Sequence, residues 1–282
     1  MKHICLTGAT GKIGRYLVPC LLDAGFFVTA VYRDGRKRRD LERAVGQHKN
    51  IEYLMRDLVE EKMPEMDVDV LIHAAGLGDA EMPYSVYHTV NVAVTQMLLE
   101  EVHAKRIIYL SSVAVYGYGE ELNGKVIDEA HVLNPKGNYA RSKVAAEKIM
   151  RKQDAIILRL GKVVFDHPKG GRRLMIDPGT ILPTLDQNSL CMFLAHISQA
   201  PDIPSGTYNV VGGEYPTMKD YLERTGQASI RLPKSRTAFL LLCALNRLIG
   251  GRFRKLRPRE YDFLTRRIRY DVSKARSLGW NP

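Results

Sequence analysis

The chain has few cysteines and none of the spacings that metal sites or disulfide frameworks use. Four cysteines occur among 282 residues, at Cys5, Cys20, Cys191 and Cys243, and no two of them form a CxxC motif. The sequence therefore indicates buried, reduced thiols, and it predicts neither a disulfide framework nor a metal site.

Long apolar runs are also missing. No run reaches the roughly 18 apolar residues that a transmembrane helix needs. The apolar residues 4–6 lead into a glycine turn too early for the apolar core of a secretory signal. We therefore expect a cytoplasmic protein.

Acidic residues are scarce only near the C-terminus. Residues 231–282 contain 14 Lys and Arg against 3 Asp and Glu, whereas residues 1–230 contain 28 of each. The net charge of +11 thus comes entirely from the C-terminal segment. An anionic partner is to be considered for that segment alone, and no nucleic acid is expected because no recognised binding module accompanies the charge.

A glycine-rich turn stands between a predicted strand, residues 4–6, and a predicted helix, residues 16–22. Its three glycines allow a tight turn, close approach of a ligand and close packing of the helix on the strand. Backbone N–H groups and the helix dipole at this point suit a pyrophosphate. An ordinary strand-to-helix turn is the alternative. The residues expected to bind a dinucleotide here are Gly8, Thr10, Gly11, Lys12, Ile13 and Gly14.

Basic residues follow the second predicted strand, residues 27–32. An NAD site normally has an acidic residue there, which holds the ribose 2′-hydroxyl. This chain has Arg33 instead, and a guanidinium suits the 2′-phosphate of NADP. NADP is therefore the expected cofactor, while Asp34, which comes about two residues late, leaves NAD open.

Further apolar strands are predicted at residues 51–55, 68–73, 107–110 and 156–160, with helices between them. This alternation predicts an α/β fold: a doubly wound parallel sheet of the Rossmann type, with its ligand crevice at the carboxyl ends of the strands. The residues that follow those ends, and are therefore expected in the crevice, are Asp57, Leu58, Ala74, Ala75, Gly76 and Ser112.

Tyr139 and Lys143 stand four residues apart at the start of a predicted helix, so they share one face. An ammonium close to a phenol lowers the phenol's pKa from its usual value near ~10. The pair is therefore a candidate acid/base.

In this order the motifs resemble the extended short-chain dehydrogenase/reductase family, which includes NAD-dependent epimerases/dehydratases, dihydroflavonol-reductase-like enzymes and 3β-hydroxysteroid dehydrogenases. The resemblance covers residues 1–165 and implies that Tyr139 is the general acid/base. It implies that Lys143 binds the nicotinamide ribose, that Ser112 hydrogen-bonds the substrate oxygen, and that Asn91 completes a proton relay. It also implies a homodimer, formed through the helices near residues 91–103 and 139–151.

Several positions depart from the family's pattern. Sugar-nucleotide epimerases carry an Asn that grips the substrate diphosphate where this chain has Lys162, and nucleotide-sugar dehydratases carry Asp-Glu where it has Val113 and Ala114. The segment 165–190 is also short for a nucleotide-sugar lobe. The side chains expected to contact the substrate are Tyr116, Lys162, Arg172 and Arg173.

These features favour an NAD(P)-dependent oxidoreductase that acts on a ketone or alcohol of a fairly apolar small molecule. An NAD-dependent nucleotide-sugar epimerase is the alternative. A non-catalytic NAD(P)-binding regulator is a third hypothesis, disfavoured because Tyr139 and Lys143 are both retained.

The expected organisation has two parts. Residues 1–165, with a strand near 207–211, form a dinucleotide-binding domain, and residues 166–282 form most of a smaller, discontinuous substrate-binding lobe. The most apolar stretch, residues 237–249, is expected to pack over the substrate pocket. Peripheral contact of residues 237–259 with anionic lipid is the weaker alternative, because the apolar stretch lacks a clear polar face.

Overall fold

The computed structural model describes residues 1–282 except 79–81, 165–172, 214, 249–255, 257 and 259. Its centre is a seven-stranded sheet with the strand order β11-β7-β5-β4-β1-β2-β3, in which every neighbouring pair is parallel. The strands are β1 (His3–Thr7), β2 (Phe27–Tyr32), β3 (Ile51–Met55), β4 (Met66–His73), β5 (Val102–Ser112), β7 (Ile156–Leu160) and β11 (Gly206–Val210). The predicted doubly wound α/β fold is confirmed.

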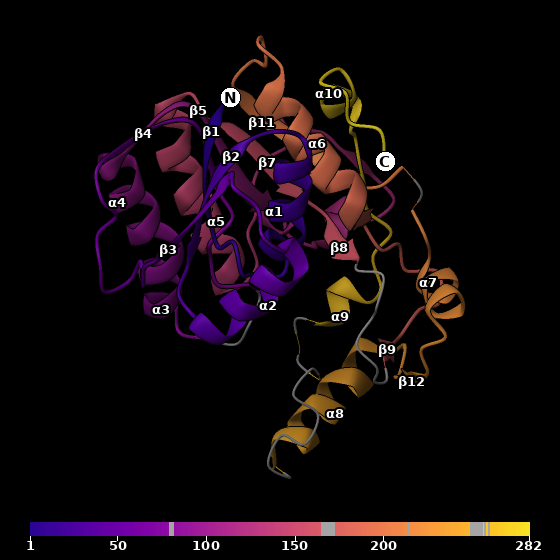
Figure 1. Ribbon diagram of the computed structural model, residues 1–282. Helices are drawn as coiled ribbons and strands as arrows, with labels where there is room; N and C mark the ends of the chain where they lie inside the picture. Colours follow the sequence, from indigo (N-terminus) through magenta and orange to yellow (C-terminus); the bar gives the residue numbers. More distant parts are fainter. Residues whose placement is uncertain (79–81, 165–172, 214, 249–255, 257, 259) are drawn as a thin grey trace.

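Helices cover both faces of this sheet, as Figure 1 shows. One face carries α1 (Gly14–Asp23), α2 (Gly35–Val45) and α6 (Gln187–Gln199), and the other carries α3 (Tyr84–His88), η1 (Thr89–Ala93), α4 (Val94–Glu101) and α5 (Asn138–Met150). In α1 the buried Leu17, Val18, Leu21 and Leu22 recur at helical spacing, which explains why this segment packs as a helix against the sheet. Strand β2 is buried along nearly its whole length because both of its faces are covered.

The direction of strand addition reverses at β1, which pairs with β2 on one side and β4 on the other. In sheets of this kind a crevice opens at that point, outside the carboxyl ends of the two strands. The loops after β1 and β4 therefore face each other across the place where a ligand can enter.

The strand predicted near residues 207–211 is β11, and it extends the main sheet by pairing with β7. The domain boundary at residue 165 stays a prediction. Smaller parallel pairs flank the main sheet: β8 (Lys162–Val164) with β10 (Thr184–Asp186), β9 (Arg173–Met175) with β12 (Ser229–Arg231), and β6 (Val126–Ile127) with β13 (Arg269–Tyr270). The remaining helices are η2 (Val113–Tyr116), η3 (Glu120–Leu122), η4 (Arg151–Gln153), α7 (Met218–Thr225), α8 (Arg236–Leu248), α9 (Glu260–Phe263) and α10 (Ser273–Arg276).

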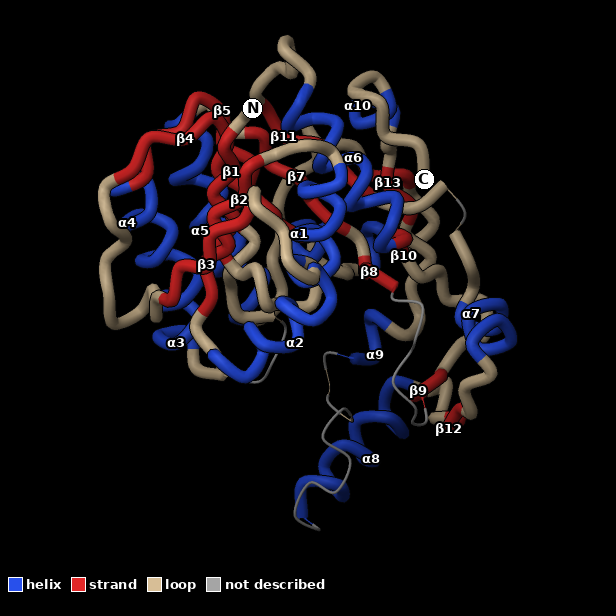
Figure 2. Tube along the Cα trace, viewed as in Figure 1, coloured by secondary structure: helices blue, strands red, loops and turns tan. Residues whose placement is uncertain are grey.

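A second, smaller apolar cluster joins β9, α7, α8 and α9. Figures 1 and 2 place these elements to the lower right of the main sheet, with α8 projecting away from the rest of the molecule. Among the described residues, no helix is long and apolar enough to cross a membrane.

Candidate active site

The glycine turn after β1 fits tightly against the loop after β4. Gly8 has a φ of +73°, and a Cβ added there would lie 2.8 Å from the Ala75 Cα. A Cβ on Gly14, the first residue of α1, would lie 2.2 Å from the Gly8 carbonyl oxygen. Side chains at either position would push the turn away from the sheet. The two glycines therefore keep the start of α1 close to the crevice, where its backbone N–H groups can meet an anion.

The crevice is an elongated cleft made of two adjoining hollows of about 410 and 510 Å³. Their shared lining is Gly8, Gly11, Ala75, Gly76 and Leu77. The first hollow continues along Lys12, Ile13, Gly14, Ala74, Ser112, Tyr139 and Lys143. The second continues along Thr10, Arg33, Lys37, Asp57 and Leu58. A cleft with a glycine turn at its middle has the shape required to hold a dinucleotide with its phosphates over the helix start.

The end of the cleft at β2 and β3 carries charges of both signs. Arg33 Nη1 lies 3.8 Å from Asp57 Oδ2, and the Arg33 side chain is 69% exposed. Asp34 caps α2 by accepting a hydrogen bond from the Arg36 N–H at 2.9 Å, and that bond lowers the pKa of its carboxyl group. The Asp57 carboxylate therefore lies beside Arg33, whose guanidinium stays accessible from the cleft.

At the opposite end, α5 delivers Tyr139 and Lys143 to the cleft. The Lys143 ammonium is buried and donates to the Leu110 carbonyl oxygen at 2.8 Å and to the Tyr109 hydroxyl at 3.1 Å. Burial lowers the pKa of Lys143 to about 8. Since an ammonium has three N–H donors, a third remains for a group in the cleft. Tyr139 is half-buried and lines the same hollow, as does Ser112 at the end of β5.

Asn91 lies behind the cleft and does not line it. Its Oδ1 accepts from the Leu77 N–H at 2.7 Å, and its Nδ2 donates to the Leu77 carbonyl oxygen and to Ser142 Oγ. A Cβ on Gly76 would lie only 3.1 Å from Asn91 Oδ1. These contacts fix the loop after β4, and they give no support to the proton-relay role expected for Asn91.

A second buried polar chain braces the same loop. The Ala75 N–H donates to Thr7 Oγ1, and the Thr7 hydroxyl lies 2.7 Å from His73 Nδ1. His73 Nε2 lies 3.0 Å from Thr95 Oγ1, whose hydroxyl donates to the Asn91 carbonyl oxygen. Because the Thr95 proton is already used, His73 must carry its own proton on Nε2 and accept at Nδ1. Burial lowers the pKa of His73 to about 3, which agrees with a neutral ring.

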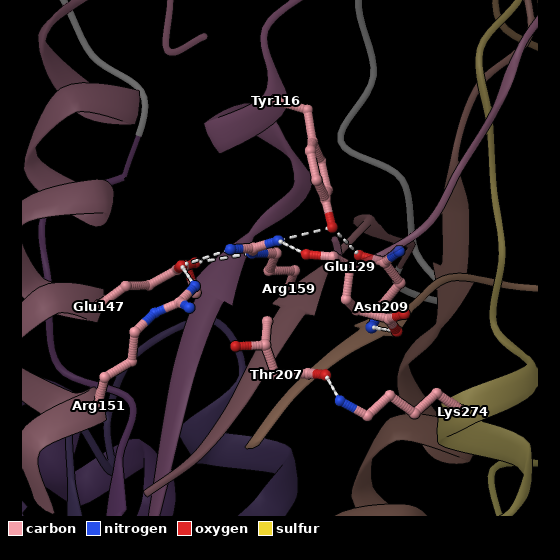
Figure 3. Close-up of polar contacts among 9 residues, drawn as sticks. Tyr116, Glu129, Glu147, Arg151, Arg159, Thr207, Asn209 and Lys274 are labelled. Atoms are coloured by element: carbon pink, nitrogen blue, oxygen red, sulfur yellow. Dashed lines mark hydrogen bonds and ion pairs between the residues drawn. The ribbon is translucent and has the colours of Figure 1, made fainter. Parts of the chain in front are cut away.

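The expectation that Tyr116 contacts the substrate is wrong. Tyr116 is completely buried, and its hydroxyl accepts from Arg159 Nη1 and donates to Asn209 Oδ1, both at 2.7 Å (Figure 3). A phenol inside an apolar core needs such partners, and these hold its hydroxyl away from the cleft.

Two of the other expected substrate contacts, Lys162 and Arg173, also lie away from the described cleft lining. The Lys162 ammonium lies 4.9 Å from the centre of the Tyr221 ring, and Arg173 Nη2 donates to the Tyr221 hydroxyl. Neither side chain is among the residues that line the two hollows. Arg172 lies outside the described residues.

A buried ion pair anchors α5, and sequence reasoning did not identify it. Arg159 on β7 donates from Nε and Nη2 to the two carboxylate oxygens of Glu147 at 3.0 and 2.8 Å, and both side chains are 1% exposed (Figure 3). Ser111 and Arg151 also donate to this carboxylate. Burial raises the pKa of Glu147, but the Arg159 hydrogen bonds and charge outweigh burial and lower it overall. The signal in the sequence was a single charged residue inside an apolar strand, which requires a buried partner.

The comparisons with known proteins agree with this geometry. The model of the NAD dependent epimerase/dehydratase family matches residues 4–174. The chain is 30% identical over 212 residues to UDP-glucose 4-epimerase 4 of Oryza sativa subsp. japonica, an alignment that covers 66% of the chain and 56% of the relative. It is 30% identical over 151 residues to a 4-hydroxy-2-methyl-3-oxo-4-farnesyl-3,4-dihydroquinoline-1-oxide ketoreductase of Stigmatella aurantiaca, which covers 51% of the chain and 44% of that protein.

Among solved structures, a UDP-glucuronic acid 4-epimerase from Bacillus cereus superposes with a TM-score of 0.76 over 99% of the chain and 94% of its own length, at 16% identity. At this identity the likeness shows the fold alone. The chain spans little more than half the length of the rice relative.

Proposed function

Because the chain belongs to the NAD-dependent epimerase/dehydratase family, as its motifs predicted, we propose that it transfers hydride between a nicotinamide dinucleotide and a substrate carbon that bears a hydroxyl or keto oxygen. The observation that carries this proposal is the single cleft in which the glycine turn, Ser112, Tyr139 and Lys143 meet. The substrate class that we propose is a nucleotide-linked sugar, epimerised at the carbon that is oxidised and reduced again. The relatives favour this alternative over our main expectation, an apolar ketone or alcohol.

The side chains at the cleft can move the proton that such a reaction needs. A bound nicotinamide supplies a reversible acceptor for the hydride. Tyr139 Oη would take the proton of the substrate hydroxyl as the carbon loses hydride, and would return it when hydride comes back. The buried Lys143 ammonium stabilises the phenolate, and Ser112 Oγ orients the substrate oxygen. Hydride lost from one face of the carbon and regained on the other gives the epimer with no net oxidation.

The border of the cleft at β7 and β8 is compatible with a charged substrate. Gly161 and Val163 line the hollow beside Leu160, and Lys162 stands between them in the chain. In this proposal the Lys162 ammonium meets a diphosphate through charge, where relatives with Asn at this position would use an amide. This arrangement requires the side chain to leave the Tyr221 ring when substrate enters.

The test of this proposal is conversion of UDP-glucose or UDP-glucuronic acid to its C4 epimer by the purified protein, followed by nuclear magnetic resonance. We expect Tyr139→Phe to lower the rate by about 10²–10⁴-fold, because it removes the group that carries the proton. Tyr84→Phe is the matched control, since Tyr84 lies outside the cleft lining and keeps its ring against Arg141. Full activity of Tyr139→Phe would disprove the acid/base assignment. Dinucleotide binding with no turnover of any substrate would favour the non-catalytic regulator.

A reductase is the second candidate, and the cations at the adenosine end of the cleft favour it. Arg33 and Lys37 line that end, where the 2′-phosphate of NADP would lie. Reductases commonly exchange NADPH with solution at each turnover, whereas an epimerase needs no net supply of it. If the protein consumes one NADPH for each product molecule and does not invert C4, it is a reductase, and the epimerase proposal is wrong.

We propose a preference for NADP on the same observation. Loss of the Arg33 guanidinium removes a charge-assisted hydrogen bond of about 1.5–3 kcal/mol. Arg33→Ala should therefore weaken NADP⁺ binding about 10- to 100-fold, measured by calorimetry, and leave NAD⁺ binding nearly unchanged. Arg43→Ala is the control, because Arg43 pairs with Asp40 away from the cleft lining. Equal losses for the two dinucleotides would contradict the preference.

A further inference from the structure

Helix α8 exposes a continuous stripe of leucines. Leu241, Leu245 and Leu248 are 62, 57 and 82% exposed, and Leu240 beside them is 41% exposed. Their spacing of four and three residues places them on one face of the helix. Scattered single apolar residues are normal on a protein surface, but a stripe of this kind marks a place where something docks.

The opposite face of α8 already has its partner within the chain. Phe239, Cys243 and Asn246 are buried, and Phe239 and Cys243 belong to the apolar cluster around α7 and α9. Each of these three residues lies two positions before one of the leucines Leu241, Leu245 and Leu248. Two positions correspond to about half a turn of the helix, so the buried residues lie opposite the leucines. The sequence of α8 lacks a clear polar face because the helix has two apolar faces. The fold covers one of them and leaves the leucines exposed.

The surroundings of the stripe are cationic. Arg236 and Arg247 lie at the two ends of α8 and are both exposed, and the Arg236 guanidinium lies 5.8 Å from the centre of the Tyr261 ring. The segment that contains α8, residues 231–282, supplies the whole net charge of +11. Figure 1 shows that α8 projects away from the main sheet.

We propose that α8 docks on an anionic lipid surface, with the leucine stripe in the interface and Arg247 at the headgroups. The helix has 13 residues and is about 20 Å long, too short for a hydrocarbon core of about 30 Å. It therefore lies along the interface. Anionic headgroups complement the charge of the segment, and each nearby Lys or Arg strengthens such binding.

A second copy of the chain suits this stripe less well than a lipid surface does. A symmetric pair formed through the leucines would bring together two copies of a segment, residues 231–282, that carries a net charge of +11. Like charges held together in this way oppose association. This inference is independent of the proposed reaction, because none of these residues lines the described cleft.

The experiment is co-sedimentation of the full chain with vesicles, either phosphatidylcholine alone or equal parts of phosphatidylcholine and phosphatidylglycerol. We expect binding to the anionic vesicles, weakened at high salt, and much less to the neutral ones. The double variant Leu241→Glu/Leu245→Glu should reduce that binding by at least about tenfold, since it removes the apolar contact and adds repulsion. Arg247→Glu should reduce it several-fold and only for the anionic vesicles.

The matched control is Met192→Glu/Val132→Glu, which places the same charges on exposed apolar residues away from α8. It should bind anionic vesicles nearly as well as the natural chain. Both double variants replace exposed side chains, so both should keep the unfolding temperature and the rate with a soluble substrate. Equal binding by the leucine variant would overturn the proposal. A second result would also overturn it: the natural chain binds neither kind of vesicle and forms a dimer, and the leucine variant does not dimerise. The leucine stripe would then bind a second copy of the chain.

Discussion

At the scale of single residues, His73 determines how the loop after β4 is held. Its ring lies between Thr7 and Thr95 in a chain of hydrogen bonds that starts at the Ala75 N–H and ends at the Asn91 carbonyl oxygen. Only a neutral ring with its proton on Nε2 satisfies every member of this chain. A protonated ring would turn Nδ1 into a donor, and the Thr7 hydroxyl would then lose the acceptor for its own proton.

This arrangement predicts a specific loss of stability in acid. The His73 pKa is about 3 in the folded protein and near its usual 6.5 in the unfolded chain. The unfolded chain therefore takes up a proton first as pH falls. The stabilisation is complete above pH ~6.5 and declines below it by about 1.4 kcal/mol per pH unit.

Urea unfolding between pH 6.5 and 4 measures this slope. His73→Gln should make the free energy of unfolding less dependent on pH by about 1.4 kcal/mol per unit, although the variant is less stable at every pH. His88→Gln removes an exposed histidine from α3 and serves as the comparison. If the curves for His73→Gln and the natural chain run parallel, His73 does not titrate as the structure requires.

The residues that line the cleft were the easiest to predict. Gly8, Gly14, Ser112, Tyr139 and Lys143 were all placed in one crevice from the sequence, and all five line it. Their positions could be read from the sequence because each is a particular residue type at a particular strand or helix end. Partners far apart in the chain were not predictable in this way, because a sequence gives no distance between Asn91 and Leu77 or between Tyr116 and Asn209.

At the scale of elements, the position of α5 depends on the Glu147–Arg159 pair. Glu147 lies one turn after Lys143, so the pair holds the helix that presents both cleft residues against β7 and β5. Breaking a buried ion pair leaves an uncompensated charge in the core, which is far more costly than losing a surface pair.

Glu147→Gln should therefore lower the free energy of unfolding by about 3–5 kcal/mol, measured by urea titration. Arg151→Gln is the control: it removes a partner that is 51% exposed and should cost under about 1 kcal/mol. Similar losses in the two variants would mean that the buried pair is not the anchor. The retained Tyr116 and Glu129 contacts of Arg159 limit the loss in Glu147→Gln, and both are visible in Figure 3.

The strands of the main sheet were predicted well where helices cover both faces of the sheet. The main strands are apolar runs because helices cover both faces, so their positions could be read from composition. Strand β5 begins at Val102, five residues before the predicted start. Its first residues pair with β4, but they are less buried than the rest of the strand and include His103 and Lys105. A polar start of this kind resembles a loop until the pairing is known.

At the scale of the whole molecule, the end of the chain returns to the main sheet. Trp280, the single tryptophan, is 2% exposed; its indole N–H donates to the Val211 carbonyl oxygen at 2.9 Å and its ring lies 5.3 Å from that of Phe193. Lys274 donates to the Thr207 carbonyl oxygen, as Figure 3 shows. The C-terminal residues thus complete the edge of the sheet at β11, while the homodimer expected through α4 and α5 stays a prediction.

Since Trp280 is packed into the same core as β11 and α6, its fluorescence should follow the unfolding of the entire sheet. We expect the urea transition measured by tryptophan emission to coincide with that measured by far-ultraviolet circular dichroism, as for one cooperative unit. Trp280→Phe keeps an aromatic ring against Phe193 but loses the bond to Val211, and should lower both the midpoint and the free energy of unfolding. A tryptophan transition at clearly lower urea than the loss of helix would mean that the C-terminal residues detach first. Residues 271–282 would then be a separate, weaker attachment to a sheet that folds without them.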